Sequence, residues 1–486
     1  MKPFKILLFI ASAIAILTVI ALLFPADGIK VAGKTLNFPS VKKIIIPQAE
    51  LDLMAYLEEE QKRDEERLQV LNGLQDSADY YRGIMEHGDI RFWFPNGDAD
   101  YFVDMFDDFE NAKEKDVVFH ILHYGDSQIE MDRLSNRLRA YMQRTFGGNG
   151  PGLLPFMPVI RSLSVQHSAS GALTHVAAYG DAPRANGHYG PLVNTHQLNG
   201  EATATFSIPT SRNVDSALMR YSRVTLLYNN HGGLHATLSS KEGMVGSKNA
   251  NNGGVGSMSW NLERPTTRLH LTVGGNADLY GVVVDGDAGV AVDNIPLRGC
   301  SGQQFTMINK SELKAAYSNM DIRLIILQFG GNSVPYIKGD KAACTYASSI
   351  GNQIERVHEC CPSAKILFIG PSDMSTTQGG EHVTYPYLPK LIDALRDSVT
   401  AHGAAFWSLY DAMGGENSMP AWVKQGLAGS DYIHYTQKGA DIMGDRITLA
   451  FDNAYNYCRI RLAMKKKEQE RAEALLEREK RENETE

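Results

Sequence analysis

The order of hydrophobic patterns along this chain of 486 residues constrains its fold more than any other feature of the sequence. Apolar runs typical of buried strands occur at four places, residues 117–122, 323–328, 365–369 and 404–407. Helical patterns lie between the later strands, at about 341–358 and 387–402. Strands that alternate with helices indicate a parallel sheet with helices on both faces. We therefore predict an α/β domain.

A stretch of different character interrupts this alternation. Between about Leu163 and Gly289 the helical periodicity fades, and short alternating runs are separated by turns rich in Gly, Asn and Ser. Several short strands at regular spacing indicate a β-sandwich. Because α/β patterns lie on both sides of it, we expect residues 166–290 to form a β-sandwich inserted into the α/β domain, which would then comprise residues 116–165 and 291–458.

The N-terminus carries a membrane signal. Lys2 and Lys5 precede nineteen uncharged residues, Ile6 to Phe24, a length at the lower end of what spans a bilayer. The positive charges place this end in the cytoplasm and the rest of the chain outside. We expect an uncleaved signal anchor over residues 1–26. A cleaved signal peptide is the alternative, although no Ala-x-Ala site follows.

The remaining segments and the charge set further limits. Residues 27–115 are predicted to form a stalk and a helical segment, and residues 459–486 a charged, solvated helical tail. The net charge is −8, so the chain lacks the basic field of a nucleic-acid-binding protein. The five cysteines include no C-x-x-C pair, and His167, His188 and His235 show no metal-ligand spacing, so a metal site has little support.

Two motifs that are far apart in the chain carry candidate catalytic chemistry. Gly125-Asp126-Ser127-Gln128 follows the first predicted strand, and Asp431-Tyr432-Ile433-His434 lies near the end of the α/β domain. A serine hydroxyl is barely ionised at neutral pH, so a nucleophilic Ser127 needs a base, which His434 can supply. Asp431 can accept the other ring N–H and fix the tautomer. Together the motifs predict a catalytic triad.

Ester hydrolysis also needs donors for the oxyanion that forms in the transition state. The loop Gln328–Asn332 follows a predicted strand, so Asn332 is expected at the carboxyl edge of the sheet, where ligands bind. A backbone N–H of the turn Arg298–Gly302 is a second candidate donor. The amide of Ser127 is a third, because the helical pattern that continues through Met142 predicts a serine near the positive end of a helix dipole.

These motifs resemble the four sequence blocks of the SGNH, or GDSL-type, hydrolases. The resemblance covers about residues 117–165 and 290–455. It implies a flavodoxin-like parallel-sheet domain of three layers. By position, the implied catalytic residues are Ser127, Asp431 and His434, and the implied oxyanion donors are Ser127, Gly299 and Asn332.

The match leaves points open at the site. Gly302 competes with Gly299 for the place of the glycine donor. Ser333 stands where the family block usually has an aspartate, so the hydrogen bonding of that loop must differ. Asp126 and Gln128, which flank the nucleophile, are the candidate substrate-binding residues.

Within that family, the run His123–Ser127 and the insertion resemble bacterial peptidoglycan O-acetylesterases and related periplasmic carbohydrate esterases, whose insertion is carbohydrate-binding-like. In the insertion, Tyr189, Trp260 and Tyr280 are candidates for stacking on sugar rings, although aromatic side chains in a sandwich more often belong to its core. The resemblance implies a serine esterase, held at the inner membrane and facing the periplasm, that removes O-acetyl groups from an envelope polysaccharide, peptidoglycan first, without a cofactor. A glycan O-acetyltransferase with the same triad and a non-catalytic glycan-binding protein stay open as alternatives, as does the oligomeric state.

Overall fold

The computed structural model describes residues 3–25, 28–31, 34–38, 48–208, 220–250 and 252–483. Lys2 of the predicted membrane signal and residues 39–47 of the predicted stalk lie outside the described residues. The chain divides into two compact units. Unit 1 comprises Met1–Ser77 with Ala463–Glu486, and unit 2 comprises Ala78–Leu462.

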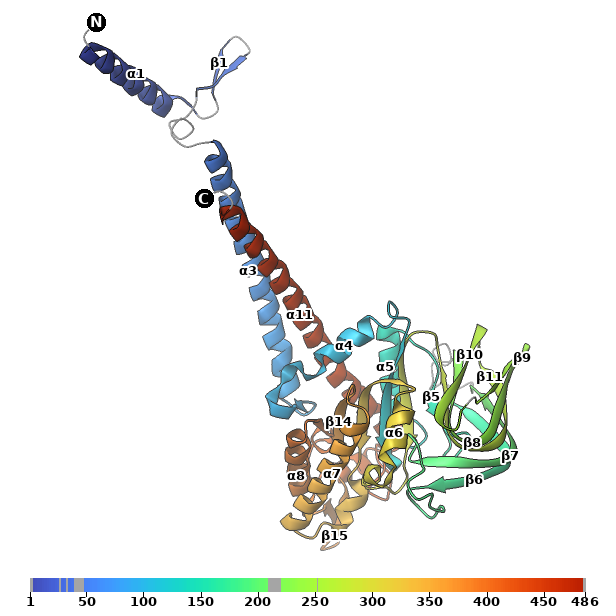
Figure 1. Cartoon of the computed structure of the whole chain (residues 1–486). Coiled ribbons are helices and arrows are strands. Elements are labelled where there is room, and N and C mark those ends of the chain that lie inside the picture. The colour runs from blue at the N-terminus through green and yellow to red at the C-terminus, as the bar shows by residue number, and fades with distance from the viewer. Residues whose placement is uncertain are drawn as a thin grey trace. The chain divides into compact units, whose positions relative to one another are not determined.

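Unit 2 is built on a six-stranded sheet with the strand order β12-β4-β13-β14-β17-β3 (Figure 1). Five neighbouring strands are parallel: β4 (Val118–Gly125), β12 (Gly289–Pro296), β13 (Asp321–Gln328), β14 (Lys365–Gly370) and β17 (Ala405–Ser408). Each of the four predicted strands is present. The sequence did not predict β12 or the short antiparallel edge strand β3 (Phe92–Trp93). All residues of β4 are buried, as expected for a strand covered on both faces.

Helices cover both faces of this sheet, which gives three layers. The larger ones are α4 (Val103–Glu110), α5 (Ser135–Phe146), α6 (Lys310–Tyr317), α7 (Asp340–Cys360), α8 (Leu388–Ala401) and the first part of α11 (Gln437–Asn483). On one face, α6, α7 and α8 share a hydrophobic core with side chains of β13 and β14 such as Ile325 and Phe368. On the other, aromatic rings of α4, α5 and α11 pack together, and Phe109 reaches Phe119 of β4. The α/β prediction is confirmed.

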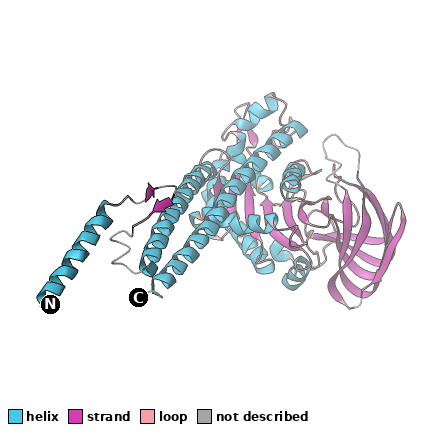
Figure 2. Cartoon of the chain, turned by 90° about the horizontal axis from the view of Figure 1, so that it is seen from above, coloured by secondary structure: helices cyan, strands magenta, loops and turns pink. Residues whose placement is uncertain are grey.

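Between β4 and β12 the chain forms a second, antiparallel sheet in the order β10-β8-β11-β7-β6, with β5 paired to β11 and β9 to β8. The strands are β5 (Gly152–Leu154), β6 (Gln166–Ala177), β7 (Asn194–Ser207), β8 (Tyr221–Ser240), β9 (Gly243–Asn249), β10 (Gly254–Thr266) and β11 (Arg268–Asp285). The sheet curves strongly around its own apolar core, as Figure 2 shows.

The predicted β-sandwich is not confirmed, because the described strands of this region join one sheet. Runs that looked like separate strands are halves of long ones: residues 223–228 and 235–239 both lie in β8, and residues 268–273 and 279–284 both lie in β11. The Gly-Gly steps between the halves are paired irregularities instead of turns. Gly275 has a φ of 118°, and a Cβ there would lie 2.6 Å from the carbonyl oxygen of Gly233. Glycine therefore lets two bent strands stay paired.

Unit 1 begins with α1 (Pro3–Leu23), followed by the short strands β1 (Ile29–Val31) and β2 (Lys34–Leu36) and the long helix α3 (Gln48–Glu86). Within α1, Phe4–Leu23 has a mean hydropathy of 3.0 over 20 residues, which is long and apolar enough to cross a membrane. A membrane anchor and a signal sequence both have these properties.

The charged tail is the last part of α11 and does not lie free in solvent. Within unit 1, the guanidinium of Arg471 donates to both carboxylate oxygens of Asp64, at 2.6 and 2.9 Å. The guanidinium of Arg481 lies 4.5 Å from the ring centroid of Tyr56. The pairing of later residues of one helix with earlier residues of the other shows that the tail runs antiparallel to α3 (Figure 1). The tail is therefore a largely exposed charged helix that also contacts α3 through Arg471 and Arg481.

Candidate active site

The nucleophile candidate lies in a tight turn at the carboxyl end of β4. After Gly125 the chain enters a 3₁₀ turn, η3 (Ser127–Ile129). The side chain of Asp126 caps this turn by accepting a hydrogen bond from the backbone N–H of Gln128 at 2.9 Å. The helix expected directly after Ser127 is absent, since α5 begins only at Ser135. The orientation of Ser127 therefore depends on a side-chain cap and not on the dipole of a long helix.

Ser127, His434 and Asp431 form one hydrogen-bonded chain. The Oγ of Ser127 lies 2.8 Å from Nε2 of His434, and Nδ1 of His434 lies 2.8 Å from Oδ2 of Asp431. Since a carboxylate only accepts, Nδ1 carries the hydrogen and the lone pair of Nε2 faces the serine hydroxyl. The arrangement can thus remove the hydroxyl proton as the oxygen attacks an acyl carbon.

The carboxylate of Asp431 is held in its charged form by local hydrogen bonds. Its Oδ1 accepts from the backbone N–H groups of Ile433 and His434 at 3.0 and 3.1 Å. Partial burial alone would raise the pKa of this carboxyl, but the His434 side chain and these two N–H groups outweigh burial and lower it. With side-chain exposures of 38% for His434 and 49% for Asp431, the base stays accessible to solvent and substrate.

The loop that carries His434 is held by contacts that the sequence did not predict. Tyr432 has a φ of +58°, an uncommon conformation for a residue with a side chain. The ring of His382 stacks on that of Tyr432 at 3.6 Å between centroids, and the N–H of Ser375 donates to the Tyr432 carbonyl at 3.1 Å. Both partners belong to the hairpin of β15 (Ser375–Gln378) and β16 (Glu381–Thr384). This hairpin therefore fixes the backbone that presents the base.

Two further side chains connect the serine turn to the histidine loop. Nε2 of Gln128 donates to the carbonyl of Ile433 at 2.8 Å. The guanidinium of Arg133 donates to the carbonyls of Ser127 at 2.7 Å and Tyr435 at 3.1 Å. Gln128 lines the cavity, but its side-chain N–H group already donates to the Ile433 carbonyl. Arg133 lies in an irregular segment, and no sequence pattern singled it out.

A cavity of about 200 Å³ opens beside the triad. Its lining includes Asp126, Ser127, Gln128, Gln328, Asn332, Tyr336, Met374 and His434. The predicted donors Ser127 and Asn332 are thus brought together at the cavity. Gly299 does not line it, and its rival Gly302 packs against the ring of Phe329 instead.

The amide of Asn332 is engaged on both sides in this structure. Nδ2 donates to the carbonyl of Cys300 at 3.0 Å and, over a longer 3.3 Å, to Oδ2 of Asp126. Burial raises the pKa of Asp126 to about 6. Asp126 therefore contacts both the serine turn and the Asn332 side chain. It can hold these two groups in position as well as contact a substrate.

The aromatic residues singled out in the insertion are not available to sugar rings. Tyr189, Trp260 and Tyr280 are all buried, so they belong to the core, which was the other role that the sequence allowed them. The exposed aromatic at the cavity is instead Tyr336, 79% exposed, in the 3₁₀ segment η5 (Gly331–Tyr336) that follows β13.

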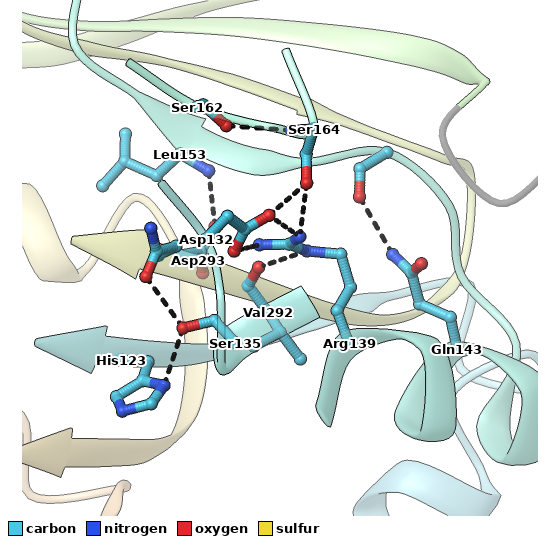
Figure 3. A network of polar contacts seen from close by, with 12 residues as sticks. His123, Asp132, Ser135, Arg139, Gln143, Leu153, Ser162, Ser164, Val292 and Asp293 are labelled. Atoms are coloured by element: carbon cyan, nitrogen blue, oxygen red, sulfur yellow. Dashed lines mark hydrogen bonds and ion pairs between the residues drawn. The ribbon is translucent and has the colours of Figure 1, made fainter. Parts of the chain in front are cut away.

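Behind the site lies a buried polar network (Figure 3). The hydroxyl of Ser135 lies 2.9 Å from Nδ1 of His123 and 2.8 Å from Oδ1 of Asn294, and Nε2 of His123 lies 3.0 Å from Oε1 of Gln328. Burial lowers the pKa of His123 to about 4, so its ring is neutral at pH 7. These hydrogen bonds connect β4, β12 and β13 to the start of α5 near the carboxyl edge of the sheet. In the part of the chain that the structure describes, no three His, Cys, Asp or Glu side chains are grouped to hold a metal ion.

Comparison with known proteins places the fold. No protein-family model matches the chain, and no curated protein sequence matches it. Among solved structures, a peptidoglycan O-acetylesterase matches with a TM-score of 0.61 and 18% identity, over 75% of this chain and 99% of that chain. The chain therefore resembles the SGNH, or GDSL-type, hydrolases in fold, as the motifs predicted.

Other matched structures are more distant. They include a family two carbohydrate esterase from Clostridium thermocellum, with a TM-score of 0.26, 9% identity, and coverage of 58% of this chain and 98% of that one. A GDSL-like lipase from Parabacteroides merdae matches with a TM-score of 0.27 and 15% identity, over 34% of this chain and 74% of that one. At these scores the matches add nothing to the argument.

Proposed function

We propose that this protein is a serine esterase that removes O-acetyl groups from a cell-envelope polysaccharide, peptidoglycan first. The observation that carries the proposal is the hydrogen-bonded chain Ser127–His434–Asp431 at the edge of an accessible cavity. A shared fold alone would not support an activity, because one fold hosts many chemistries. The three side chains in this order are what acyl transfer requires.

The first half of the reaction acylates the serine. Oγ of Ser127 bonds to the acetyl carbon while its proton moves to Nε2 of His434, and the carbonyl oxygen becomes an oxyanion. The carbon–oxygen bond to the sugar then breaks, and the proton on Nε2 passes to the departing sugar oxygen. Asp431 stabilises the imidazolium in between and keeps the ring in one orientation.

The second half returns the enzyme to its starting state. A water molecule gives a proton to His434 and attacks the acetyl carbon of the acyl-serine. Collapse of the second tetrahedral intermediate breaks the bond to Oγ, which takes the proton back, and acetate leaves. If a sugar hydroxyl occupied the place of this water, the same steps would transfer the acetyl group.

The oxyanion needs preorganised donors near Ser127. The serine N–H and the Asn332 amide are the candidates at the cavity. The hydrogen bond from Asn332 to Asp126 is longer than the one to Cys300, so it is the weaker of the two. The N–H that points to Asp126 is therefore the one more easily redirected to the oxyanion. Gly299 stays a proposed third donor and requires its turn to shift toward the cavity.

One feature of the cavity rim supports a sugar substrate. Tyr336 offers an exposed ring beside the nucleophile, and aromatic faces suit the apolar faces of sugar rings. We further propose that α1 anchors the protein in the inner membrane with the catalytic unit in the periplasm, where an acetylated wall polymer would be its substrate.

Acetate release tests this proposal. The full-length protein in detergent micelles is incubated with O-acetylated peptidoglycan, acetylated xylan and a small aryl acetate, beside Ser127→Ala and the control Ser318→Ala, which alters the exposed serine that follows α6. We expect release that Ser127→Ala abolishes and Ser318→Ala preserves, fastest on peptidoglycan. No release from any of the three substrates would refute the esterase, and acetyl transfer to added glycan without release would indicate a transferase.

A further inference from the structure

A second cavity lies beside the active site, where the edge of the parallel sheet meets the antiparallel sheet. Its lining includes Leu154, His167, Tyr179, Leu192, Asn194 and Pro296. Pro296 of β12 is the register partner of Gly125 of β4, two residues before the nucleophile. Because neighbouring strands are about 4.8 Å apart, this cavity begins roughly one strand away from the serine turn, at the same carboxyl edge.

The cavity is larger than a single water site. Its volume is about 50 Å³. One water molecule needs about 10–15 Å³ by this measure. Most of the wall is apolar, from Leu154, Val159, Ile160 and Leu192. Such a mixture of apolar wall and few polar atoms is typical of a small-ligand site.

Two polar atoms of the wall have no hydrogen-bond partner in the protein: Oδ1 of Asn194 and Nε2 of His167. Asn194 is 5% exposed, and its Nδ2 donates to the Tyr179 hydroxyl at 3.1 Å and the Leu192 carbonyl at 2.9 Å. The amide is therefore fixed with its oxygen as the free acceptor. The ring of His167 is fixed by stacking on Phe206, 5.3 Å between centroids. Burial lowers the pKa of His167 to about 4, so the neutral ring can donate from Nε2.

The two buried charged groups of the same wall, Asp132 and Arg139, are already paired, and Arg161, which also lines it, is exposed to solvent. Arg139 donates to Asp132, to the hydroxyl of Ser164 and, at 2.8 Å, to the carbonyl of Val292 (Figure 3). Asp132 also accepts from Ser164. With its charge neutralised, Arg139 does not call for an anion. The free acceptor on Asn194 would also repel one. The cavity therefore suits a neutral group with one donor, one acceptor and an apolar end.

An acetamido group has these features. We propose that this cavity binds the acetamido group of an N-acetylhexosamine in the same glycan that the active site deacetylates, an inference that rests on the proposed function. The amide N–H donates to Oδ1 of Asn194, the carbonyl oxygen accepts from Nε2 of His167, and the methyl group packs against Leu154 and Leu192. The choice of substrate then depends on the acetamido group of one sugar, whereas Ser127 attacks the O-acetyl group of another.

The test compares two oligosaccharides that differ only at this group. Chitotriose and cellotriose share length and linkage, but chitotriose carries acetamido groups where cellotriose carries hydroxyls. Binding is measured by calorimetry on the full-length Ser127→Ala protein in detergent micelles. We expect the Kd for chitotriose to be at least tenfold lower. His167→Phe, which keeps the stacking ring, and Asn194→Leu, which keeps the volume, should each reduce that preference to less than threefold.

A matched control is available on the same strand. His175 also lies on β6 with a buried Nε2 that has no partner, but it does not line this cavity. His175→Phe should therefore keep the preference for chitotriose. Circular dichroism establishes that each variant is folded, and the two substitutions at separate residues allow one to fail without loss of the test.

Three results would overturn the proposal. They are equal affinities for the two sugars, no binding of either at millimolar concentration, and a preference that survives both substitutions. The last would place acetamido recognition elsewhere, and the second would leave the cavity filled with water only. Because the measurement involves no turnover, its outcome is independent of whether the protein proves to be an esterase.

Discussion

At the scale of single residues, the hydrogen bond between Asp431 and His434 sets which ring nitrogen is basic. Asp431→Asn keeps the shape of the side chain but allows the amide to donate to Nδ1, which puts the hydrogen on Nε2. We expect kcat on an aryl acetate to fall roughly 10²–10⁴-fold with little change in KM. Stopped-assay kinetics at pH 7 measure this. An activity within threefold of wild type would mean that Asp431 does not orient the base.

Asp126 gives a pH-dependent contribution to stability. Its folded-state pKa is about 6 against an ordinary value of 3.8, because burial disfavours the charged form. The folded protein thus binds this proton more tightly than the unfolded chain. The resulting stability is fully present below pH 3.8 and is lost as the pH rises through about 6. Over that window we expect Asp126 to lower the unfolding free energy by on the order of 3 kcal/mol.

Urea unfolding at pH 4 and pH 7 checks this expectation, with Asp126→Asn as the comparison. The variant cannot ionise at this position, so it should lose less stability than wild type between the two pH values. If the unfolding free energy changed equally in both proteins between pH 4 and pH 7, the Asp126 carboxyl would ionise as freely in the folded protein as in solvent.

Tyr336 tests whether the rim of the cavity recognises sugar. Tyr336→Ala removes the exposed ring, whereas Tyr336→Phe retains it. We expect Tyr336→Ala to lower the ratio of kcat/KM on acetylated polymer to that on aryl acetate by about tenfold, since stacked aromatic contacts contribute roughly 0.5–1.5 kcal/mol beyond burial. The phenylalanine variant should keep the ratio near that of wild type. A ratio unchanged in both variants would remove Tyr336 from substrate recognition.

At the scale of elements, His120 joins three strands. From β4, its Nδ1 lies 2.9 Å from Asp293 of β12 and its Nε2 lies 3.5 Å from Asp285 of β11, and all three side chains are buried. Burial alone would lower the pKa of His120, but the two carboxylates raise it to about 10. The ring is therefore charged at pH 7, and it ties the parallel sheet to the antiparallel one.

His120→Phe should destabilise unit 2 by about 3–5 kcal/mol, because two buried carboxylates lose their counter-charge. The wild-type contribution is fully present below pH 6.5, the ordinary value, and is lost as the pH rises through about 10. Urea midpoints at pH 7 and pH 9.5 measure both effects. The control is His188→Phe, which removes a half-exposed ring paired with Glu312 and should cost only about 1 kcal/mol. Equal losses in the two variants would contradict a special role for the buried pair.

The sequence predicted these elements unevenly, for physical reasons. Continuous apolar runs revealed β4, β13, β14 and β17 of the parallel sheet, since both faces of such strands are buried, but not β12. The carboxyl ends of parallel strands share one edge, which is why the motifs around Ser127 and Asn332 could be expected to meet. The Gly-Gly steps of β8 and β11 imitate turns, so long bent strands were divided into short ones. The contacts of Arg133, Tyr336 and His382 depend on loop conformations that no local pattern encodes.

At the scale of the whole molecule, unit 1 pairs segments from both ends of the chain. The inner positions of α3 include charged residues such as Asp64, so the pairing with the tail relies on complementary charge. We expect Arg471→Asp to increase amide hydrogen exchange in α3 roughly twofold to fivefold, an effect that salt reduces in wild type. The double variant Asp64→Arg with Arg471→Asp should restore protection. Exchange that stays high in the double variant would mean that the charges do not pair.

The pairing of Tyr56 with Arg481 has a consequence for how this chain can be modified. Since unit 1 comprises Met1–Ser77 with Ala463–Glu486, residues 78–462 form one continuous insertion between its two segments. Another domain with adjacent termini could therefore replace residues 78–462 and leave both helical segments of unit 1 in place.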